Sequence, residues 1–319
     1  MIYREIGRIG IELSLLGLGG HEFLPNGRSR GFNEDWKKAL TPRYIFPGFG
    51  GEKRRRVMAM AYEAGINFYD ATQDSEKEAL GRMLREMPPP FEVFVQTRPE
   101  DMMYDRDPGN VRMADYPQLK AEVERILKLM GRGHLDFLNL GITPEAFRND
   151  PEYLARLKSA TDLLKSDGLI RFTSADTFRG EETYLAQVAS GAFDTLFINL
   201  NFADSAGLAK VLPAAQQAGL GVNGREVYLK GALFKMGAEA GIGDNDALVR
   251  AALRWALSLP ELTSMMVGAD TTAHLQTALT VLEAPNLTGE DQALLERVQA
   301  TPAFQDYAAA KAREFADLP

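Results

Sequence analysis

Charged side chains recur where short apolar runs of the sequence end. His21 and Glu22 follow one such run, Asp70 follows a second, and Arg98 and Arg225 follow or end two others. An imidazole titrates near neutral pH and can act as a general acid or base or bind a metal. A guanidinium can grip a carboxylate or phosphate with two hydrogen bonds. We therefore predict His21, Glu22, Asp70 and Arg98 as catalytic groups and Arg225 as a substrate-binding residue.

Amide and phenol side chains extend this candidate site. Asn139, Asn199 and Asn201 fall on or just after strand-like runs, where alternate residues share a face. Tyr44 and Tyr104 lie in polar segments and could contact the substrate or supply a proton. We predict all five as substrate-binding residues.

Structural roles compete with these chemical roles. The histidine could bond the backbone, the asparagines could satisfy loops, and the arginines could balance nearby carboxylates. A metal site built from His21, Glu22, Asp70 and Asp74 is a further alternative, but their spacing matches no specific metal-binding pattern. We predict no metal.

Composition limits the class of protein. The 319 residues include 36 Lys and Arg against 44 Asp and Glu, a net charge of −8, and no cysteine. The absence of cysteine excludes disulfides and thiolate chemistry, and an acidic chain with no basic stripe is a poor nucleic-acid binder. No apolar run approaches the ~20 residues of a membrane span, and no signal peptide is visible. We expect a cytoplasmic protein with a small-molecule ligand. The oligomeric state is left open.

The elements that must position the candidate groups follow from an alternation of patterns. Short apolar runs indicate strands buried on both faces, at 14–18, 67–69, 92–96, 136–140, 169–173, 195–200, 221–225 and 264–267. Amphipathic stretches indicate helices between them, at 52–64, 76–86, 116–130, 151–165, 180–189, 205–218, 246–258 and 272–282. Eight strand–helix units predict a (β/α)8 TIM barrel. A doubly wound sheet is the alternative, although its glycine-rich turn into a helix is missing.

We expect one domain over residues 1–319. A small hairpin over 3–12 precedes the barrel, and two helices, over 288–298 and 301–316, follow it. The long segment 23–51 is rich in aromatic residues and predicts a lid. Because barrel enzymes keep their sites at the C-terminal ends of the strands, the candidate residues should meet there.

The sequence resembles the aldo-keto reductase superfamily along nearly its whole length. The most specific segments are Gly-Ile-Asn-Phe-Tyr-Asp at 65–70 and Ala-Leu-Arg-Trp at 252–255, supported by matches at 4–7, 15–20, 75–76, 80–81, 166–171 and 266–269. The resemblance implies a (β/α)8 barrel that reduces carbonyls with NADPH. It also implies a tyrosine proton donor whose acidity is set by an Asp–Lys pair and a histidine.

The family's catalytic set is largely replaced. Asp70 matches the family's aspartate, but the loop that should hold the tyrosine is shortened to 71–74 and lacks it. Arg98 stands at the lysine position and Gly141 at the histidine position. Arginine does not release its proton near neutral pH and is a poor relay.

The cofactor contacts implied by the resemblance are also altered. Asp176 and Thr177 stand where the family's Ser-Asn pair holds the nicotinamide amide, Phe197 stands at the glutamine position, and Arg225 replaces the stacking aromatic. Thr277 and Ala278 replace the Glu-Asn pair of the adenine side. The remaining candidates for cofactor binding are Gly268, Thr271, Thr272 and His274, at a helix N-terminus that could bind an anion.

Three functions are therefore open. The first is an enzyme with a remodelled site that acts on a small polar or anionic metabolite, with redox-neutral acid/base chemistry as one option. The second is an NADP-dependent oxidoreductase with an unusual proton donor. The third is a non-catalytic barrel that binds a ligand or a partner. The cofactor is left as unknown, with NADP possible.

Overall fold

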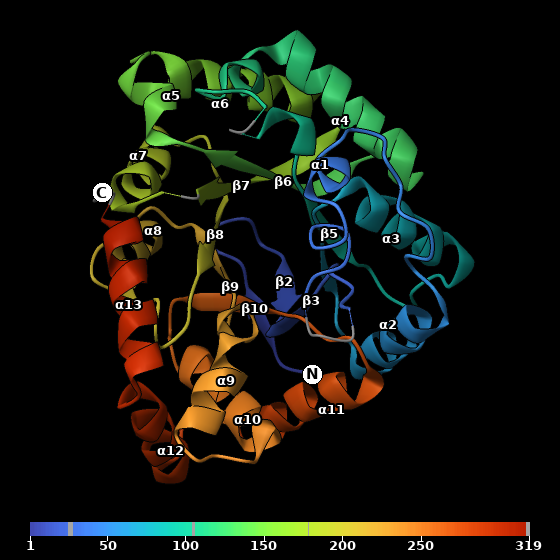
Figure 1. Cartoon of the computed structure of the whole chain (residues 1–319). Coiled ribbons are helices and arrows are strands. Elements are labelled where there is room, and N and C mark those ends of the chain that lie inside the picture. The colour runs from blue at the N-terminus through green and yellow to red at the C-terminus, as the bar shows by residue number, and fades with distance from the viewer. Residues whose placement is uncertain (25–27, 104–105, 178, 317–319) are drawn as a thin grey trace.

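Eight parallel strands close into a barrel in a computed structural model that describes residues 1–24, 28–103, 106–177 and 179–316 (Figure 1). The strands follow one another around the barrel in chain order, and the last pairs with the first. They are β3 (Leu16–Gly19), β4 (Phe68–Ala71), β5 (Phe94–Thr97), β6 (Leu135–Ile142), β7 (Ile170–Thr177), β8 (Thr195–Asn199), β9 (Gly221–Arg225) and β10 (Leu262–Val267). The predicted (β/α)8 barrel is confirmed.

Helices surround the barrel. They are α2 (Glu52–Ala64), α3 (Asp74–Glu86), α4 (Tyr116–Met130), α5 (Pro144–Arg148), α6 (Tyr153–Ser166), α7 (Glu181–Ser190), α8 (Val211–Gln217), α9 (Ala232–Glu239), α10 (Asn245–Leu257) and α11 (Thr272–Thr280). Two C-terminal helices follow, α12 (Gly289–Gln299) and α13 (Pro302–Phe315), as the sequence predicts. Within the described ranges, no helix has both the length and the apolar character that crossing a membrane requires.

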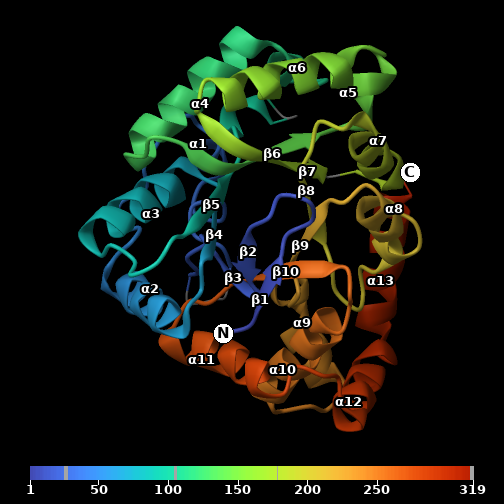
Figure 2. The same ribbon diagram turned by 180° about the vertical axis from the view of Figure 1, so that it is seen from behind.

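A two-stranded hairpin covers the N-terminal end of the barrel. Its strands, β1 (Tyr3–Glu5) and β2 (Glu12–Ser14), pair antiparallel, and they lie in front of the barrel when it is seen from behind (Figure 2). Ser14 therefore belongs to the hairpin and not to the barrel strand predicted from residue 14. The C-terminal ends of the barrel strands face the opposite side of the molecule.

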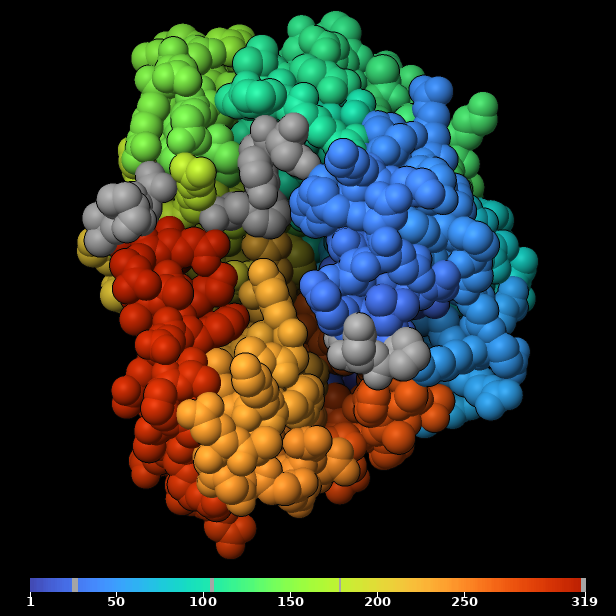
Figure 3. All heavy atoms as spheres, viewed as in Figure 1, coloured from blue at the N-terminus to red at the C-terminus, as the bar shows by residue number. Residues whose placement is uncertain are grey.

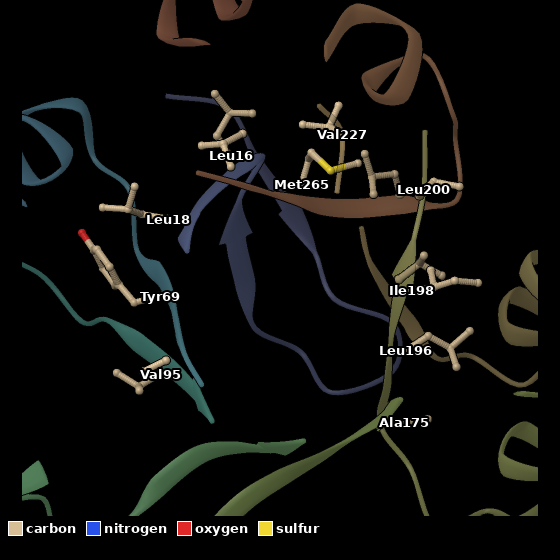
Figure 4. Close-up of a cluster of buried hydrophobic side chains, with 14 of the residues drawn as sticks. Leu16, Leu18, Tyr69, Val95, Ala175, Leu196, Ile198, Leu200, Val227 and Met265 are labelled. Atoms are coloured by element: carbon tan, nitrogen blue, oxygen red, sulfur yellow. The ribbon is translucent and has the colours of Figure 1, made fainter. Parts of the chain in front are cut away.

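Alternation along each strand separates two cores. Outward side chains such as Leu18, Tyr69 and Val95 pack between strands and helices (Figure 4). Inward side chains fill the N-terminal part of the barrel interior with a second apolar cluster, and the hairpin covers that cluster. Its buried members are Ile6, Leu13, Phe68, Phe94, Phe137, Phe197 and Met266.

The part of the barrel interior nearer the C-terminal ends of the strands is polar. The strand register places Asp70 beside Gln96, Gly141 beside Asp176 and Asn199 beside Arg225. These positions share the inward face with the phenylalanines, because residues two apart on a strand point the same way. Polar side chains therefore sit above an aromatic floor.

Two strands extend further toward the C-terminal end than the sequence indicates. β6 ends at Ile142 instead of residue 140, and β7 ends at Thr177 instead of residue 173. These two strands share seven paired positions, from Leu135–Ile170 to Ile142–Thr177. The pairing continues because Asp176 and Thr177 are buried, so backbone groups there need ladder partners.

Candidate functional site

The C-terminal face of the barrel is hollowed between two blocks of structure (Figure 3). The described part of the insertion, from residue 28 on, forms one block, and α9 together with α13 forms the other. The polar inward positions of the strands lie beneath this face. This is the mouth at which barrel enzymes place their chemistry.

His21 stands at the edge of the mouth, directly after β3. Its Nδ1 lies 2.6 Å from Oε1 of Glu76. The His21 side chain is 39% exposed, whereas that of Glu76 is 1% exposed. A carboxylate only accepts hydrogen bonds, so Nδ1 carries the hydrogen and Nε2 is left to take up or release a proton. His21 is thus oriented through Nδ1, while its side chain is partly exposed.

The first turn of α3 fixes Glu76. Gln73 is the N-cap of this helix, and the carboxylate of Glu76 accepts hydrogen bonds from the backbone of Thr72 (2.8 Å) and Gln73 (3.3 Å). This is a capping box, in which a Glu three residues into the helix satisfies otherwise unpaired N–H groups. One oxygen of Glu76 therefore serves the helix, while the other holds His21.

The charges in this corner shift one another's pKa values. Burial lowers the pKa of His21, but the charge and hydrogen bond of Glu76, together with the charge of Asp70, outweigh burial and raise it. Burial alone would raise the pKa of Glu76, yet His21 and the two backbone N–H groups lower it. His21 is thus biased toward its protonated form and Glu76 toward its ionised form.

Asp70 is the penultimate residue of β4, next to this pair. Its Oδ1 accepts a hydrogen bond of 3.0 Å from Nε2 of Gln96, which is fully buried. Burial raises the pKa of Asp70, and the amide of Gln96 offsets only part of the shift. Asp70 and His21 lie close enough for each to affect the other's proton affinity.

Arg98 pairs with a neighbour that the sequence analysis did not assign to it. Its guanidinium donates to both carboxylate oxygens of Glu100, at 2.5 and 3.1 Å. Both side chains are largely buried, at 15% and 5% exposure. Asp70, the partner expected from the resemblance, instead bonds Gln96.

A larger polar network crosses the mouth from β6 to β9. Arg225 donates two hydrogen bonds to Asp176, at 2.7 and 2.8 Å, and a third to Oδ1 of Asn199 at 2.7 Å. Asn139 donates to the same carboxylate at 3.2 Å, and the guanidinium carbon lies 4.7 Å from the ring centroid of Phe197. Asp176 is fully buried. Arg225 is therefore an internal counter-ion as well as a residue at the mouth.

The predicted asparagines have different surroundings. Asn139 and Asn199 belong to this network. Asn201 instead holds its own turn, accepting from the backbone of Ala203 and Asp204 and donating to the carbonyl of Glu226. The structure gives Asn201 the loop role that competed with substrate binding.

Glu22 is bonded to the backbone of the insertion. Its Oε1 accepts from the backbone N–H of Gly50 at 2.5 Å, and burial raises its pKa. With Arg54, Asp70 and Glu76 it lines an internal cavity of about 10 Å³, the room of roughly one water molecule. In the described part of the chain, no three His, Asp or Glu side chains are grouped as a metal ion would need.

The insertion is fastened to the first turn of α3. The backbone N–H of Arg43 donates to Asp74 at 2.8 Å, and that of Phe46 donates to Oγ of Ser75 at 2.9 Å. Nε2 of Gln73 donates to the carbonyl of Arg30. The short helix of the insertion, α1 (Trp36–Ala39), lies on the mouth side, in the foreground of Figure 1. The predicted lid is thus joined to the same helical turn that holds His21.

The two candidate tyrosines are placed differently. Tyr44 packs within the insertion, with its ring centroid 4.8 Å from that of Phe46 and the ammonium group of Lys38 5.5 Å above its ring. Tyr104 lies outside the described residues.

The residues left for a dinucleotide do not fit NADP(H). Asp270 stands beside the N-terminus of α11, where a phosphate would need positive charge, and it forms an ion pair with Lys53. Thr271 is the N-cap of α11, and its side-chain oxygen already accepts a hydrogen bond from the backbone N–H of His274. The residue His274 itself is exposed. Phe23 lies against Gly268, within 3.2 Å of where a Cβ would stand. On the nicotinamide side, the positions that should bind the amide and stack on the ring hold the Asp176–Arg225 ion pair.

Sequence reasoning missed Glu76 as the partner of His21, Gln96 as the partner of Asp70, and Glu100 as the partner of Arg98. Gln96 and Glu100 are polar residues at the end of a predicted strand, so their position was a usable signal. Glu76 has the capping signature of Gln73 followed by Glu76, but that signature predicts a helix start and does not indicate a bound histidine.

Comparison with known proteins supports the fold. The chain is similar to the structure of the aldo-keto reductase AKR11C1 from Bacillus halodurans in its holo form, with a TM-score of 0.67 and 17% sequence identity. The match covers 93% of this chain and 96% of that chain. No protein-family model and no curated protein matches the sequence. At this identity the likeness shows a shared barrel fold.

Proposed function

We propose that this barrel is a divergent member of the aldo-keto reductase superfamily that performs redox-neutral acid/base chemistry on a small polar metabolite. The observation that carries the proposal is the half-exposed His21 held by the buried Glu76 at the barrel mouth. A histidine oriented through one nitrogen by a carboxylate, with the other nitrogen accessible, is the usual form of a general acid or base.

Asp70 supplies the second group of the proposed reaction. Its raised pKa makes the carboxylate a stronger base than that of an exposed aspartate. Protonated His21 would donate a proton from Nε2 to a departing or carbonyl oxygen, and the Asp70 carboxylate would accept one from a carbon or hydroxyl of the substrate. This exchange moves two protons and no electrons, as an elimination, hydration or isomerisation requires.

The paired arginines favour a neutral polar substrate over an anionic one. Arg98 donates to Glu100 and Arg225 donates to Asp176, each through two hydrogen bonds. An anion would have to compete with a buried carboxylate that is already in place. The two arginines therefore stabilise buried carboxylates within the site, and we do not expect them to attract an anionic substrate.

The pKa of His21 can be measured directly, because the chain has only three histidines. In a pH titration of the imidazole NMR signals, the signal that His21→Gln removes is expected to titrate above the ordinary value of ~6.5. Glu76→Gln is expected to lower that pKa, because it removes the charge that stabilises the imidazolium. Glutamine also serves in a capping box, so the helix start should persist.

His134 provides a matched control for this titration. It lies at the other end of the barrel, is 45% exposed, and is also near a buried carboxylate, with Nε2 3.4 Å from Asp136. His134→Gln should leave the titration of His21 unchanged. A His21 signal that titrates below the ordinary value, or that ignores Glu76→Gln, would remove the basis of the proposed acid/base role.

A cofactor titration tests the redox-neutral part of the proposal. We expect NADPH to cause no saturable change in protein fluorescence, because Asp270 opposes a phosphate and the Asp176–Arg225 pair fills the nicotinamide side. The variant Asp270→Asn should not create tight binding by itself. Saturable binding of NADPH by the unaltered protein would instead favour an oxidoreductase with an unusual proton donor.

A further inference from the structure

The aromatic rings of the insertion differ in exposure, and among the described ones Trp36 is the one that is exposed. Phe46 and Phe49 are 6% and 4% exposed, and the guanidinium of Arg30 covers the Phe49 ring at 4.6 Å. Trp36, at the start of α1, is 56% exposed. The insertion thus buries two of its rings, partly covers others and leaves one large ring open to solvent.

The exposed ring is continuous with the proposed acid/base group. The Phe32 ring centroid lies 5.4 Å from that of Trp36 and 5.7 Å from that of His21, which meets it edge to face at 89°. We call His21, Phe32 and Trp36 the aromatic edge. Its anchors to α3 fix its position, since Gln73 bonds the carbonyl of Arg30 and Asp74 bonds the backbone of Arg43.

We propose that the aromatic edge binds a planar ring of the substrate and so presents the polar substituent of that ring to His21. This inference rests on the proposed function and names its substrate class as small, uncharged compounds with an aromatic or heteroaromatic ring. Aromatic rings favour offset-stacked or edge-to-face partners at centroid separations of 4.5–7 Å.

The size of the open surface argues for a small molecule over a protein partner. One aromatic side chain offers on the order of 150–250 Å², whereas a stable protein interface needs about 800 Å² from each partner. Among the described residues, the other strongly exposed large apolar side chain of the insertion is Ile45, at 37% exposure. Two scattered side chains suit a ligand ring and fall well short of an interface.

Three uncharged amides form the test: benzamide, its saturated analogue cyclohexanecarboxamide, and acetamide, which has no ring. The chain has two tryptophans, so Trp255→Phe leaves Trp36 as the only indole reporter. Benzamide is expected to change Trp36 emission and the His21 imidazole signal saturably. Cyclohexanecarboxamide and acetamide should bind at least about tenfold more weakly, because they lack the planar ring face.

Variants separate the ring contact from general effects. Trp36→Ala should weaken the benzamide effect on the His21 signal by about tenfold, while the pKa of His21 stays unchanged. Ile45→Ala, on the same insertion, should leave both unchanged. The inference is overturned if acetamide binds as tightly as benzamide, if none of the three amides saturates, or if Trp36→Ala has no effect. Benzamide binding together with a His21 pKa that ignores Glu76→Gln would contradict the acid/base role alone.

Discussion

Replacing Arg225 by methionine is expected to destabilise the protein by about 3–5 kcal/mol, because it removes the guanidinium that pairs directly with a buried carboxylate. Asp176 has no exposed surface, and Arg225 supplies two of its hydrogen bonds. The remaining bond from Asn139 is a single contact of 3.2 Å to one oxygen. The change is to be measured as the loss in free energy of unfolding in urea, near neutral pH.

Arg56→Met provides the control, since Arg56 pairs with Glu52 at 3.0 Å while both side chains are more than 70% exposed. That variant should change stability by no more than about 0.5 kcal/mol. Asp176→Asn combined with Arg225→Met should recover part of the loss, because the neutral amide is far less costly to bury than a lone charge. Equal stability of Arg225→Met and Arg56→Met would show that the pair across the mouth contributes little.

Gly81→Ala is the second substitution expected to have a large effect. Gly81 lies inside α3, where alanine would normally stabilise the helix by about 1 kcal/mol. A Cβ at this position would meet the carbonyl oxygen of Met130 at 2.1 Å and the carbonyl carbon at 2.6 Å, both backbone atoms at the end of α4. The backbone of Met130 cannot rotate away as a side chain can, so α3 and α4 must move apart. We expect this to lower the free energy of unfolding by roughly 1–3 kcal/mol or more.

The displacement should also reach the site, because the first turn of α3 carries Glu76. We expect Gly81→Ala to lower the melting temperature and to shift the His21 imidazole signal. Gly133→Ala is the matched control, since nothing lies within 4 Å of a Cβ there. A stabilised Gly81→Ala protein would mean that helix propensity outweighs the close approach of α3 to α4.

The sequence predicted the barrel, its hairpin and its closing helices because these depend on periodicity and on turn residues, which are local. The strand ends were less well predicted: Asp176 and Thr177 were expected beyond a strand but continue β7, since burial keeps their backbone in the ladder. Pairings between side chains were predicted least well. His21 and Glu76 are 55 positions apart, and Asp176 and Arg225 are 49 apart. Spacing along the chain places two residues on the same face of the barrel. It does not determine which of several carboxylates a given histidine or arginine will contact.

The first turn of α3 has a consequence for how the site opens and closes. Its residues Gln73, Asp74, Ser75 and Glu76 bond, in order, the carbonyl of Arg30, the backbone of Arg43, the backbone of Phe46 and the ring of His21. Because one helical turn holds all four, fraying of that turn would release the insertion and the imidazole together. Regions coupled in this way open as one cooperative unit. Amide hydrogens from Gln73 to Glu76 and those of Arg43 and Phe46 should therefore exchange with solvent at a common opening free energy, so that this turn, the insertion and His21 form one foldon.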